Sequence, residues 1–250
     1  MQKEKLIKTI GKYFLNGQSK GAVLKIKDKI LTSNFFTDTQ QCVGELKVTD
    51  FDLQDSVLGI GATQGFLNIL KPFGDEIQFK IEGDSDNSSK ILMADKTFKS
   101  RYYLFDKSVI PQVEISAGGL GDIVLEFEIN SEFIANFKKA KEAISDSNHF
   151  AIVSDDKNTR CVINYNQSTN NHILFNFVPQ IKESDDIKLV FDIATFNEVL
   201  NANNDFSSAK LQVYANCTDF NDILLITFEG IDWAAKYYII PKLMATKDED

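Results

Sequence analysis

Most of the chain alternates apolar and polar residues over short stretches bounded by turn residues such as Lys27-Asp28 and Gly83-Asp84. This alternation is the period of a β-strand that buries one face and exposes the other to water. The pattern predicts strands in the first half over residues 21–27, 29–35, 41–48, 56–61, 76–83, 90–95 and 98–105. In the second half it predicts strands over residues 122–129, 149–155, 160–166, 172–179, 187–193, 209–215, 222–230 and 234–241.

A long helix is predicted over residues 2–15, where apolar side chains recur at helical spacing and Asn16-Gly17 ends the pattern. A step of about 100° per residue separates two faces of this helix. The face predicted to be buried consists of Leu6, Ile7, Ile10 and Phe14. The opposite side is predicted to carry a stripe of lysines, namely Lys5, Lys8 and Lys12.

The second long helix is predicted over residues 131–144, with Ser131 as its N-cap and Glu132 near its positive end. Lys138 and Lys139 point away from the apolar face, whereas Lys141 lies at its border. That apolar face consists of Phe133, Phe137, Ala140 and Ile144. Shorter helices are predicted over residues 62–71, which Pro72 ends, and over residues 193–203.

The order of these elements repeats. Each half begins with a long helix, continues with four strands and a short helix, and ends with three strands, which indicates an internal duplication. The segment between the halves contains Pro111 and becomes rich in glycine, as connectors do. We therefore expect an α+β fold with an N-terminal domain over residues 1–108, a connector over 109–121 and a C-terminal domain over 122–250. Each domain should pack two helices on antiparallel sheets.

The composition is that of an ordinary globular chain, with 43% hydrophobic and 25% charged residues among 250. No apolar run approaches the roughly 18 residues that a membrane span needs, and no secretory signal begins the sequence. Cys42, Cys161 and Cys217 are widely spaced and form no CxxC pair, which favours buried core thiols. We expect an intracellular protein without a membrane partner.

No motif for catalysis stands out. His149 and His172 lie beside no cluster of metal-ligand spacing, and no Walker A or GxSxG sequence occurs. The stretch GIGATQG, residues 59–65, has the spacing GxGxxxG and lacks a surrounding βαβ pattern, so it predicts a plain strand–turn–helix junction. Residues 84–87 resemble half of a calcium loop but favour a hairpin tip. We expect no catalytic residues, no metal and no cofactor.

The distribution of charge along the chain bears on whether the lysine stripes bind an anionic partner. The chain has a formal net charge of −9, which argues against nucleic acid as a partner unless positive charge is gathered locally. A stripe of lysines on a helix is often only a solvated face without a binding role. Here they occur at corresponding positions of two repeats within an acidic chain, and lysine suits sequence-independent contact with phosphate.

Several stretches together resemble the sliding DNA clamps of the PCNA and T4-type phage family. The resemblance is diffuse but spans nearly the whole chain in the right order. Residues 131–144 with 149–165 resemble the start of the clamp's second domain, and residues 236–242 with the acidic end resemble its last strand and tail. Residues 63–70, 187–200 and 226–230 are similar to phage clamps. The first domain lacks a clear leading strand, which favours a phage-type clamp.

The resemblance implies a closed ring of subunits joined head to tail, a homotrimer for two-domain subunits, with helices around the central hole. Such a ring would be a non-enzymatic processivity factor that encircles duplex DNA without sequence preference. Its partners would be a DNA polymerase and a clamp-loader ATPase, in the cytoplasm of a phage-infected bacterial host. The DNA-binding residues would be Lys5, Lys8, Lys12, Lys138, Lys139 and Lys141.

The resemblance also implies two protein-binding regions. A partner-peptide pocket under the connector would use Phe105, Val109, Ile110, Tyr238, Ile240 and Pro241. The subunit interface would pair the edge strands 98–105 and 172–178, through Tyr102, Tyr103, Leu104, Ile173, Phe175 and Phe177.

Two other classes stay open at this point. A phage virion or scaffold protein built from repeated β-domains would also bury its edge strands but would not need matched lysine stripes. A small-molecule enzyme would need a pocket with perturbed titratable groups.

Overall fold

The computed structural model describes residues 1–113, 119–165, 171–183, 186–218 and 222–242. The chain forms two compact units. The first contains Met1–Ile115 together with Ala202–Ser207 and Glu229–Lys236, and the second contains Ser116–Asn201, Ser208–Phe228 and Tyr237–Asp250. Short segments from the far end of the chain thus belong to the first unit. The predicted domain boundaries stay predictions, and the middle of the predicted connector and the acidic end lie outside the described residues.

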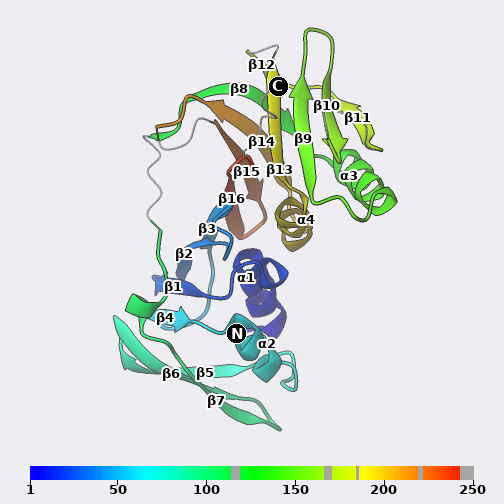
Figure 1. Ribbon diagram of the computed structural model, residues 1–250. Helices are drawn as coiled ribbons and strands as arrows, with labels where there is room; N and C mark the ends of the chain where they lie inside the picture. Colours follow the sequence, from blue (N-terminus) through cyan, green and yellow to red (C-terminus); the bar gives the residue numbers. More distant parts are fainter. Residues whose placement is uncertain (114–118, 166–170, 184–185, 219–221, 243–250) are drawn as a thin grey trace, which may run out of the picture. The chain divides into compact units, whose positions relative to one another are not determined.

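The first unit packs two helices against antiparallel strands (Figure 1). Its main strands lie in the order β3-β2-β1-β4, and residues 233–236 of β16 follow next to β3. A separate sheet has the order β5-β6-β7. The elements are α1 (Lys3–Phe14), β1 (Ala22–Lys27), β2 (Ile30–Phe36), β3 (Cys42–Val48), β4 (Ser56–Ile60), α2 (Thr63–Leu70), β5 (Gln78–Asp84), β6 (Asn87–Ala94) and β7 (Lys99–Tyr103), with short 3-10 turns at Leu15–Gly17 and Lys107–Val109.

The second unit repeats the arrangement. Its sheets have the orders β11-β10-β9-β13 and β12-β8-β14-β15. The elements are β8 (Asp122–Glu128), α3 (Ser131–Ala143), β9 (His149–Ser154), β10 (Thr159–Ile163), β11 (Ile173–Phe177), β12 (Ile181–Lys182), β13 (Ile187–Asp192), α4 (Ile193–Ala202), β14 (Ser208–Ala215), β15 (Asp222–Glu229) and the end of β16 (Trp233–Ile239), whose residues 233–236 belong to the first unit. The predicted order of elements is confirmed. Among the described elements, the strand β12 was not predicted, because an alternation of apolar and polar residues cannot be recognised over two residues.

Helix α1 ends where the sequence predicted. Leu15 and Asn16 take left-handed backbone angles, with φ of 47° and 52°, and Gly17 follows with φ of 99°. Its buried face differs from the prediction, because Ile7 is 37% exposed. The apolar part of the face instead consists of Leu6, Ile10, Tyr13 and Phe14, with Thr9 buried beside them.

The first unit lacks a full leading strand, as expected. Gln2 forms only an isolated antiparallel bridge with Glu76. The amide of Ile77 also donates to the carbonyl of Met1 at 3.1 Å. This bridge and the hydrogen bonds of Met1 and Lys3 hold the start of the chain to the segment that leads into β5.

The glycines of the GIGATQG stretch serve packing at the β4–α2 junction. A Cβ on Gly61 would lie 2.5 Å from the ring of Phe105, and one on Gly59 would lie 2.2 Å from the Phe105 carbonyl oxygen. The Phe105 amide also donates to the Gly59 carbonyl at 2.9 Å. These glycines let the segment after β7 cross β4 at close range. The strand–turn–helix prediction is confirmed, and residues 84–87 lie at the β5–β6 hairpin tip.

A cluster of phenylalanines forms the centre of the second unit. Phe137 of α3 packs edge-to-face on Phe150 of β9 with ring centroids 5.4 Å apart, and Phe196 of α4 lies 4.8 Å from Phe137. These rings are fully buried. Aromatic pairs of this kind add to the burial of apolar area. Of the predicted buried face, Phe133, Phe137 and Ala140 are buried, whereas Ile144 follows the last helical residue and is half-buried.

The cap of α3 corrects the prediction by one residue. The side chain of Asn130, not Ser131, accepts a hydrogen bond from the Phe133 amide at 2.8 Å. Asn130 has the extended backbone of an N-cap, with φ −113° and ψ 175°, whereas Ser131 is already helical. Both residue types suit the position, so composition alone did not separate them.

We expect Asn130→Ala to lower the free energy of unfolding by about 1 kcal/mol, because an amide at the helix start loses its acceptor. Ser131→Ala is the matched control and should change it by less than about 0.5 kcal/mol. Thermal and urea unfolding followed by circular dichroism measure both. A larger loss for Ser131→Ala would contradict the cap assignment.

Candidate nucleic-acid interface

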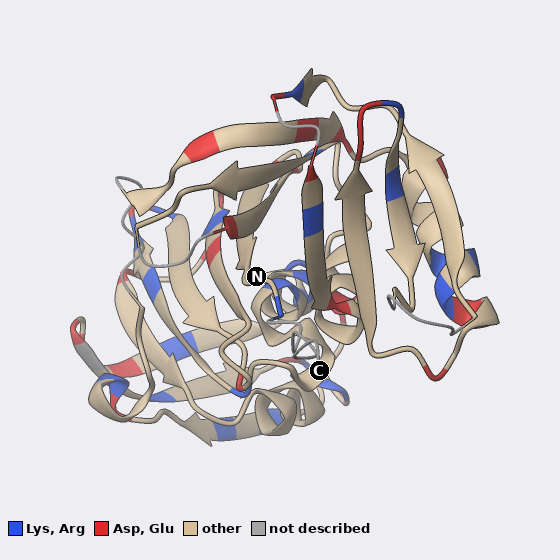
Figure 2. Cartoon of the chain, turned by 45° about the horizontal axis from the view of Figure 1, so that its top comes forward, with Lys and Arg blue, Asp and Glu red and all other residues tan. Residues whose placement is uncertain are grey.

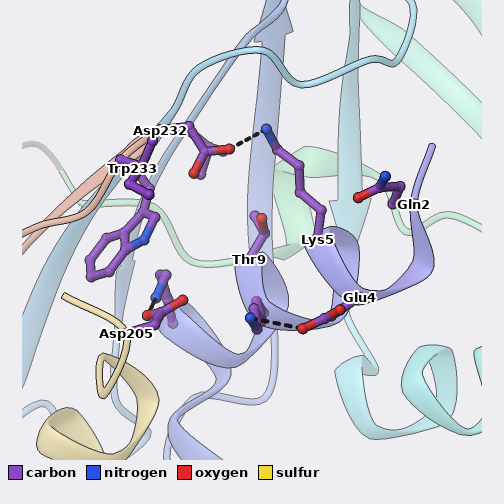
Figure 3. A pocket seen from close by; sticks show the side chains of 11 residues that line it. Gln2, Glu4, Lys5, Thr9, Asp205, Asp232 and Trp233 are labelled. Atoms are coloured by element: carbon purple, nitrogen blue, oxygen red, sulfur yellow. Dashed lines mark hydrogen bonds and ion pairs between the residues drawn. The ribbon is translucent and has the colours of Figure 1, made fainter. Parts of the chain in front are cut away.

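The lysine side of α1 borders a cavity of about 370 Å³ (Figure 3). Helix α1 forms one wall, and residues 205 and 231–233 from the far end of the chain form the other. All of these residues belong to the first unit. Acidic side chains therefore approach the predicted DNA-binding stripe within its own unit.

Lys5 is held by its surroundings. Its ammonium pairs with the carboxylate of Asp232 (Figure 3) and donates to the backbone carbonyls of Thr49 at 3.0 Å and Asp50 at 3.1 Å. The side chain is mostly buried. A phosphate that reached Lys5 would have to displace these acceptors.

Lys12 does not lie on a solvated stripe. Its side chain is 2% exposed, its ammonium lies 2.8 Å from the Asp205 carboxylate, and it stands 3.4 Å from the centroid of the Trp233 ring. Burial lowers the pKa of Lys12, while the hydrogen bond to Asp205 acts in the opposite direction. The prediction of an outward-facing Lys12 is wrong, because segments remote in sequence cover this side of α1.

Lys8 is the lysine of the predicted stripe that faces solvent. Its ammonium lies 2.8 Å from Glu4, one turn earlier on the helix, and both side chains are more than half exposed. The hydrogen bond to Glu4 raises the pKa of Lys8. Exposed pairs of this kind contribute little to stability and exchange with water and salt. Lys8 is thus the residue of the stripe that phosphate could reach most easily.

The lysines of α3 differ from those of α1. Within the described residues, no carboxylate oxygen lies within 4.0 Å of the ammonium groups of Lys138, Lys139 or Lys141. Lys139 is exposed, and Lys138 and Lys141 are half-buried. Figure 2 shows basic residues gathered on the turns of α3. Their positive charge is available to an anionic partner.

Strands β7 and β11, which are predicted to pair across the subunit boundary, are both terminal strands of their sheets, β7 beside β6 and β11 beside β10. Of the predicted interface residues, Tyr102 packs on Phe66 with centroids 4.7 Å apart, whereas Tyr103 is 64% exposed. Phe175 and Phe177 pack edge-to-face on Phe133 of α3, and Leu104 and Ile173 are half-buried.

Several exposed apolar residues at these edges were not among the predicted interface residues, although Phe105 was predicted as part of the partner-peptide pocket. Phe98 and Phe105 flank β7, Leu174 lies on β11, and Val178 follows β11. Val178 is 89% exposed. Exposed apolar side chains beside free strand edges are typical of association surfaces. The signal was present in the sequence, but alternation alone does not say which face is covered.

The predicted partner-peptide pocket is divided between the two units. Phe105 and Val109 are exposed in the first unit, where Ile110 is buried. Tyr238 is buried in the second unit, where Ile240 and Pro241 are half-buried. The pocket as a whole stays a prediction.

Among the described residues, no group of three or more His, Cys, Asp or Glu side chains could hold a metal ion. No helix in the described part of the chain is long and apolar enough to cross a membrane. The three cysteines are buried, and burial raises the pKa of Cys42 and Cys161.

Comparison with known proteins places the fold. No protein-family model matches the sequence, and no curated protein matches it either. Among solved structures, PCNA of A. fulgidus, bound to the C-terminal region of FEN-1, matches with a TM-score of 0.71 and 15% identity over 98% of both chains. The chain has the fold of a PCNA sliding clamp.

Further PCNA structures agree. Proliferating cellular nuclear antigen from Entamoeba histolytica matches with a TM-score of 0.68 and 17% identity over 97% of this chain and 96% of that one. A chain of the PCNA2–PCNA3 complex from Sulfolobus tokodaii matches with a TM-score of 0.64 and 10% identity over 94% and 96%. The clamp fold therefore covers nearly the whole chain at low sequence identity.

The buried pair of Lys12 and Asp205 makes a prediction for stability. Asp205→Asn should lower the free energy of unfolding of the first unit by about 1–3 kcal/mol, because it leaves an ammonium without its counter-charge. Adding Lys12→Met should recover part of the loss. Trp233, the single tryptophan of the chain, reports on this unit by fluorescence during urea unfolding.

The exposed pair of Lys8 and Glu4 supplies the control. Glu4→Gln should change the free energy of unfolding by less than about 0.5 kcal/mol. If Asp205→Asn also falls within that range, Lys12 is not held by Asp205 as the structure indicates.

Proposed function

We propose that this protein is a sliding DNA clamp, a non-enzymatic processivity factor that encircles duplex DNA. The observation that carries the proposal is the clamp fold over nearly the whole chain, combined with α3 lysines whose ammonium groups have no described carboxylate oxygen within 4.0 Å, in a chain of net charge −9. Neither part is sufficient by itself, because a fold can host several functions.

Electrostatics supports the proposal. A clamp must hold DNA while sliding, so its contacts should reach phosphates, ignore sequence and be individually weak. The ammonium groups of Lys138, Lys139 and Lys141 suit such contacts, because no carboxylate oxygen in the described residues lies within 4.0 Å of them. Lys8 adds a fourth contact whose exposed partner yields easily. Lys5 and Lys12 contribute less, since each is engaged inside its unit.

The free edges support assembly of a ring, for which we propose a homotrimer. Strand β7 and strand β11 are different surfaces, so pairing them joins subunits head to tail, and such contacts can close into a ring. The exposed Tyr103 and Leu174 would then become covered. Ring closure would cover the unpaired edges of β7 and β11 at once.

We further propose a DNA polymerase and a clamp-loader ATPase as partners, in a phage-infected bacterial cell. A closed ring cannot thread onto circular DNA unaided, so loading needs an enzyme that opens it. The exposed Phe105 and Val109 offer apolar area to a partner peptide. The solved complex of A. fulgidus PCNA with the C-terminal region of FEN-1 supports this mode of binding. The fold does not favour a virion or scaffold protein.

The role of α3 predicts a loss of function on charge removal. The triple variant Lys138→Ala, Lys139→Ala and Lys141→Ala should shorten the DNA tracts that a clamp-dependent polymerase makes. The slope of log affinity for duplex DNA against log salt should also fall, by up to about 0.9 for each phosphate that the variant no longer neutralises.

A variant of equal charge change provides the control. Lys27→Ala, Lys29→Ala and Lys157→Ala alter exposed lysines that are not on α3, and tract length should stay near that of the unaltered protein. Equal effects of the two triple variants would mean that net charge, and not α3, governs DNA binding.

The exposed edges of β7 and β11 lead to a prediction about the association state. Leu174→Glu should shift the assembled protein toward monomer, because the side chain is 45% exposed on β11 and a buried carboxylate is costly. Ile231→Glu changes a fully exposed apolar residue that belongs to neither edge strand and should leave assembly intact. Mass measurement in solution at micromolar concentration decides this. A monomeric unaltered chain would argue against the ring.

A further inference from the structure

The sheet β5-β6-β7 carries an exposed face that the clamp function does not use. Its strand register sets three rows of side chains across this face. The rows are Gln78, Ala94 and Lys99, then Lys80, Leu92 and Arg101, then Glu82, Lys90 and Tyr103. The opposite face of the sheet is buried, since Ile81, Ile91 and Tyr102 point inward and Tyr102 packs on Phe66 of α2.

Positive charge gathers on this face although the chain is acidic. Lys80, Lys99 and Arg101 are exposed, and Lys90 adds a fourth cation in the row of Glu82. The Glu82 carboxylate lies 2.8 Å from Lys90 and 3.4 Å from Lys80, so one carboxylate on this face serves two lysines. Lys99 and Arg101 therefore keep their charge available on β7.

Arg101 is preorganised. Its guanidinium donates to the Tyr103 hydroxyl at 3.2 Å, two residues along the same strand. Arginine is rare in this chain, where only positions 101 and 160 carry it. A guanidinium can bind a carboxylate through two parallel hydrogen bonds, which a lysine cannot do. The positioned guanidinium of Arg101 therefore suits a ligand with carboxylate groups better than nonspecific association with small anions.

A groove of about 530 Å³ runs along β6 between the outer strands. Leu92 and Ala94 form its apolar floor, Lys80 stands on the β5 side, and Lys99 and Arg101 stand on the β7 side. The two walls lie two strand spacings apart, about 10 Å. This width accommodates one extended polypeptide chain.

We propose that this groove binds an acidic peptide segment of a partner protein. An apolar side chain of the peptide packs on Leu92, and its carboxylates pair with Lys80, Lys99 and Arg101. Opposite charges attract the peptide to the groove, and packing on the apolar floor adds a contact beyond the electrostatic attraction. The groove lies along β6, so the outer edge of β7 stays available for pairing with another strand.

Nucleic acid fits the groove less well. Single strands bind through bases stacked on aromatic rings as well as through phosphates. Phe79 is the aromatic residue of the groove lining, and it alternates with Lys80, so its side chain belongs to the other face of the sheet. Tyr103 is already bound by Arg101. Phosphates would reach the cations, but the apolar floor would stay unfilled.

The test uses the full chain and a fluorescein-labelled synthetic peptide of about twelve residues that alternates glutamate and leucine. Fluorescence anisotropy should show saturable binding that weakens as salt rises, because exposed charge pairs are screened. Arg101→Ala combined with Lys99→Ala should weaken binding about tenfold or more. The affinity of the Arg101→Lys variant should lie between those of the unaltered chain and the double variant. Lysine keeps the positive charge but cannot form two parallel hydrogen bonds with a carboxylate.

Three controls make the outcome decisive. Lys27→Ala with Lys29→Ala removes the same charge from exposed positions elsewhere and should not change peptide binding. A peptide with serine in place of leucine should bind several-fold more weakly, as the apolar floor requires. Solution mass and circular dichroism should match for all variants, because the altered side chains are exposed.

The proposal is overturned if the peptide does not bind saturably, if Arg101→Ala with Lys99→Ala leaves its affinity unchanged, or if labelled oligothymidine of equal length binds the groove more tightly than the peptide does. The peptide assay contains no DNA, so its result is independent of whether the chain acts as a clamp.

Discussion

The buried ammonium of Lys12 holds the first helix to segments that arrive from the far end of the chain. It lies against the Asp205 carboxylate and over the Trp233 ring. The pair of Lys5 and Asp232 makes a second contact between α1 and these segments. A lone buried ammonium would be costly, so Asp205 is needed for the packing to be stable. Because these segments belong to the first unit, that unit is complete only after the last strands of the chain have been made.

This constraint separates two helices that look equivalent in sequence. Both carry three lysines beside an apolar face, with Lys141 alone predicted at the border of that face, and both begin a repeat. In the stripe of α1 each lysine has a carboxylate partner, whereas within the described residues Lys138, Lys139 and Lys141 have none. Positive charge that acts on a partner depends on what neutralises it nearby, not on the number of lysines. The duplicated architecture thus carries unequal electrostatics, and α3 is the stronger candidate for contact with DNA.

The exposed surfaces of the sheets also differ from one another in what they can bind. On β5-β6-β7, the register brings Lys80 and Arg101 to opposite sides of Leu92, so residues from three strands form one groove. At β7 and β11 the backbone itself is the unsatisfied feature, and exposed apolar side chains accompany it. One kind of surface attracts a charged ligand, and the other attracts a strand.

The sequence by itself determined the elements, their order and the duplication, because strand and helix periods are local properties that a short stretch of residues displays. It also determined the core face of α3, where Phe133 and Phe137 recur at helical spacing. Only the tertiary structure decided that Lys12 is buried and that Ile7 is exposed, since the residues that cover Lys12 lie about 190 or more positions away. It also decided that the glycines of residues 59–65 accommodate Phe105. Local period says which residues share a face, whereas the environment of that face depends on contacts that no local pattern contains.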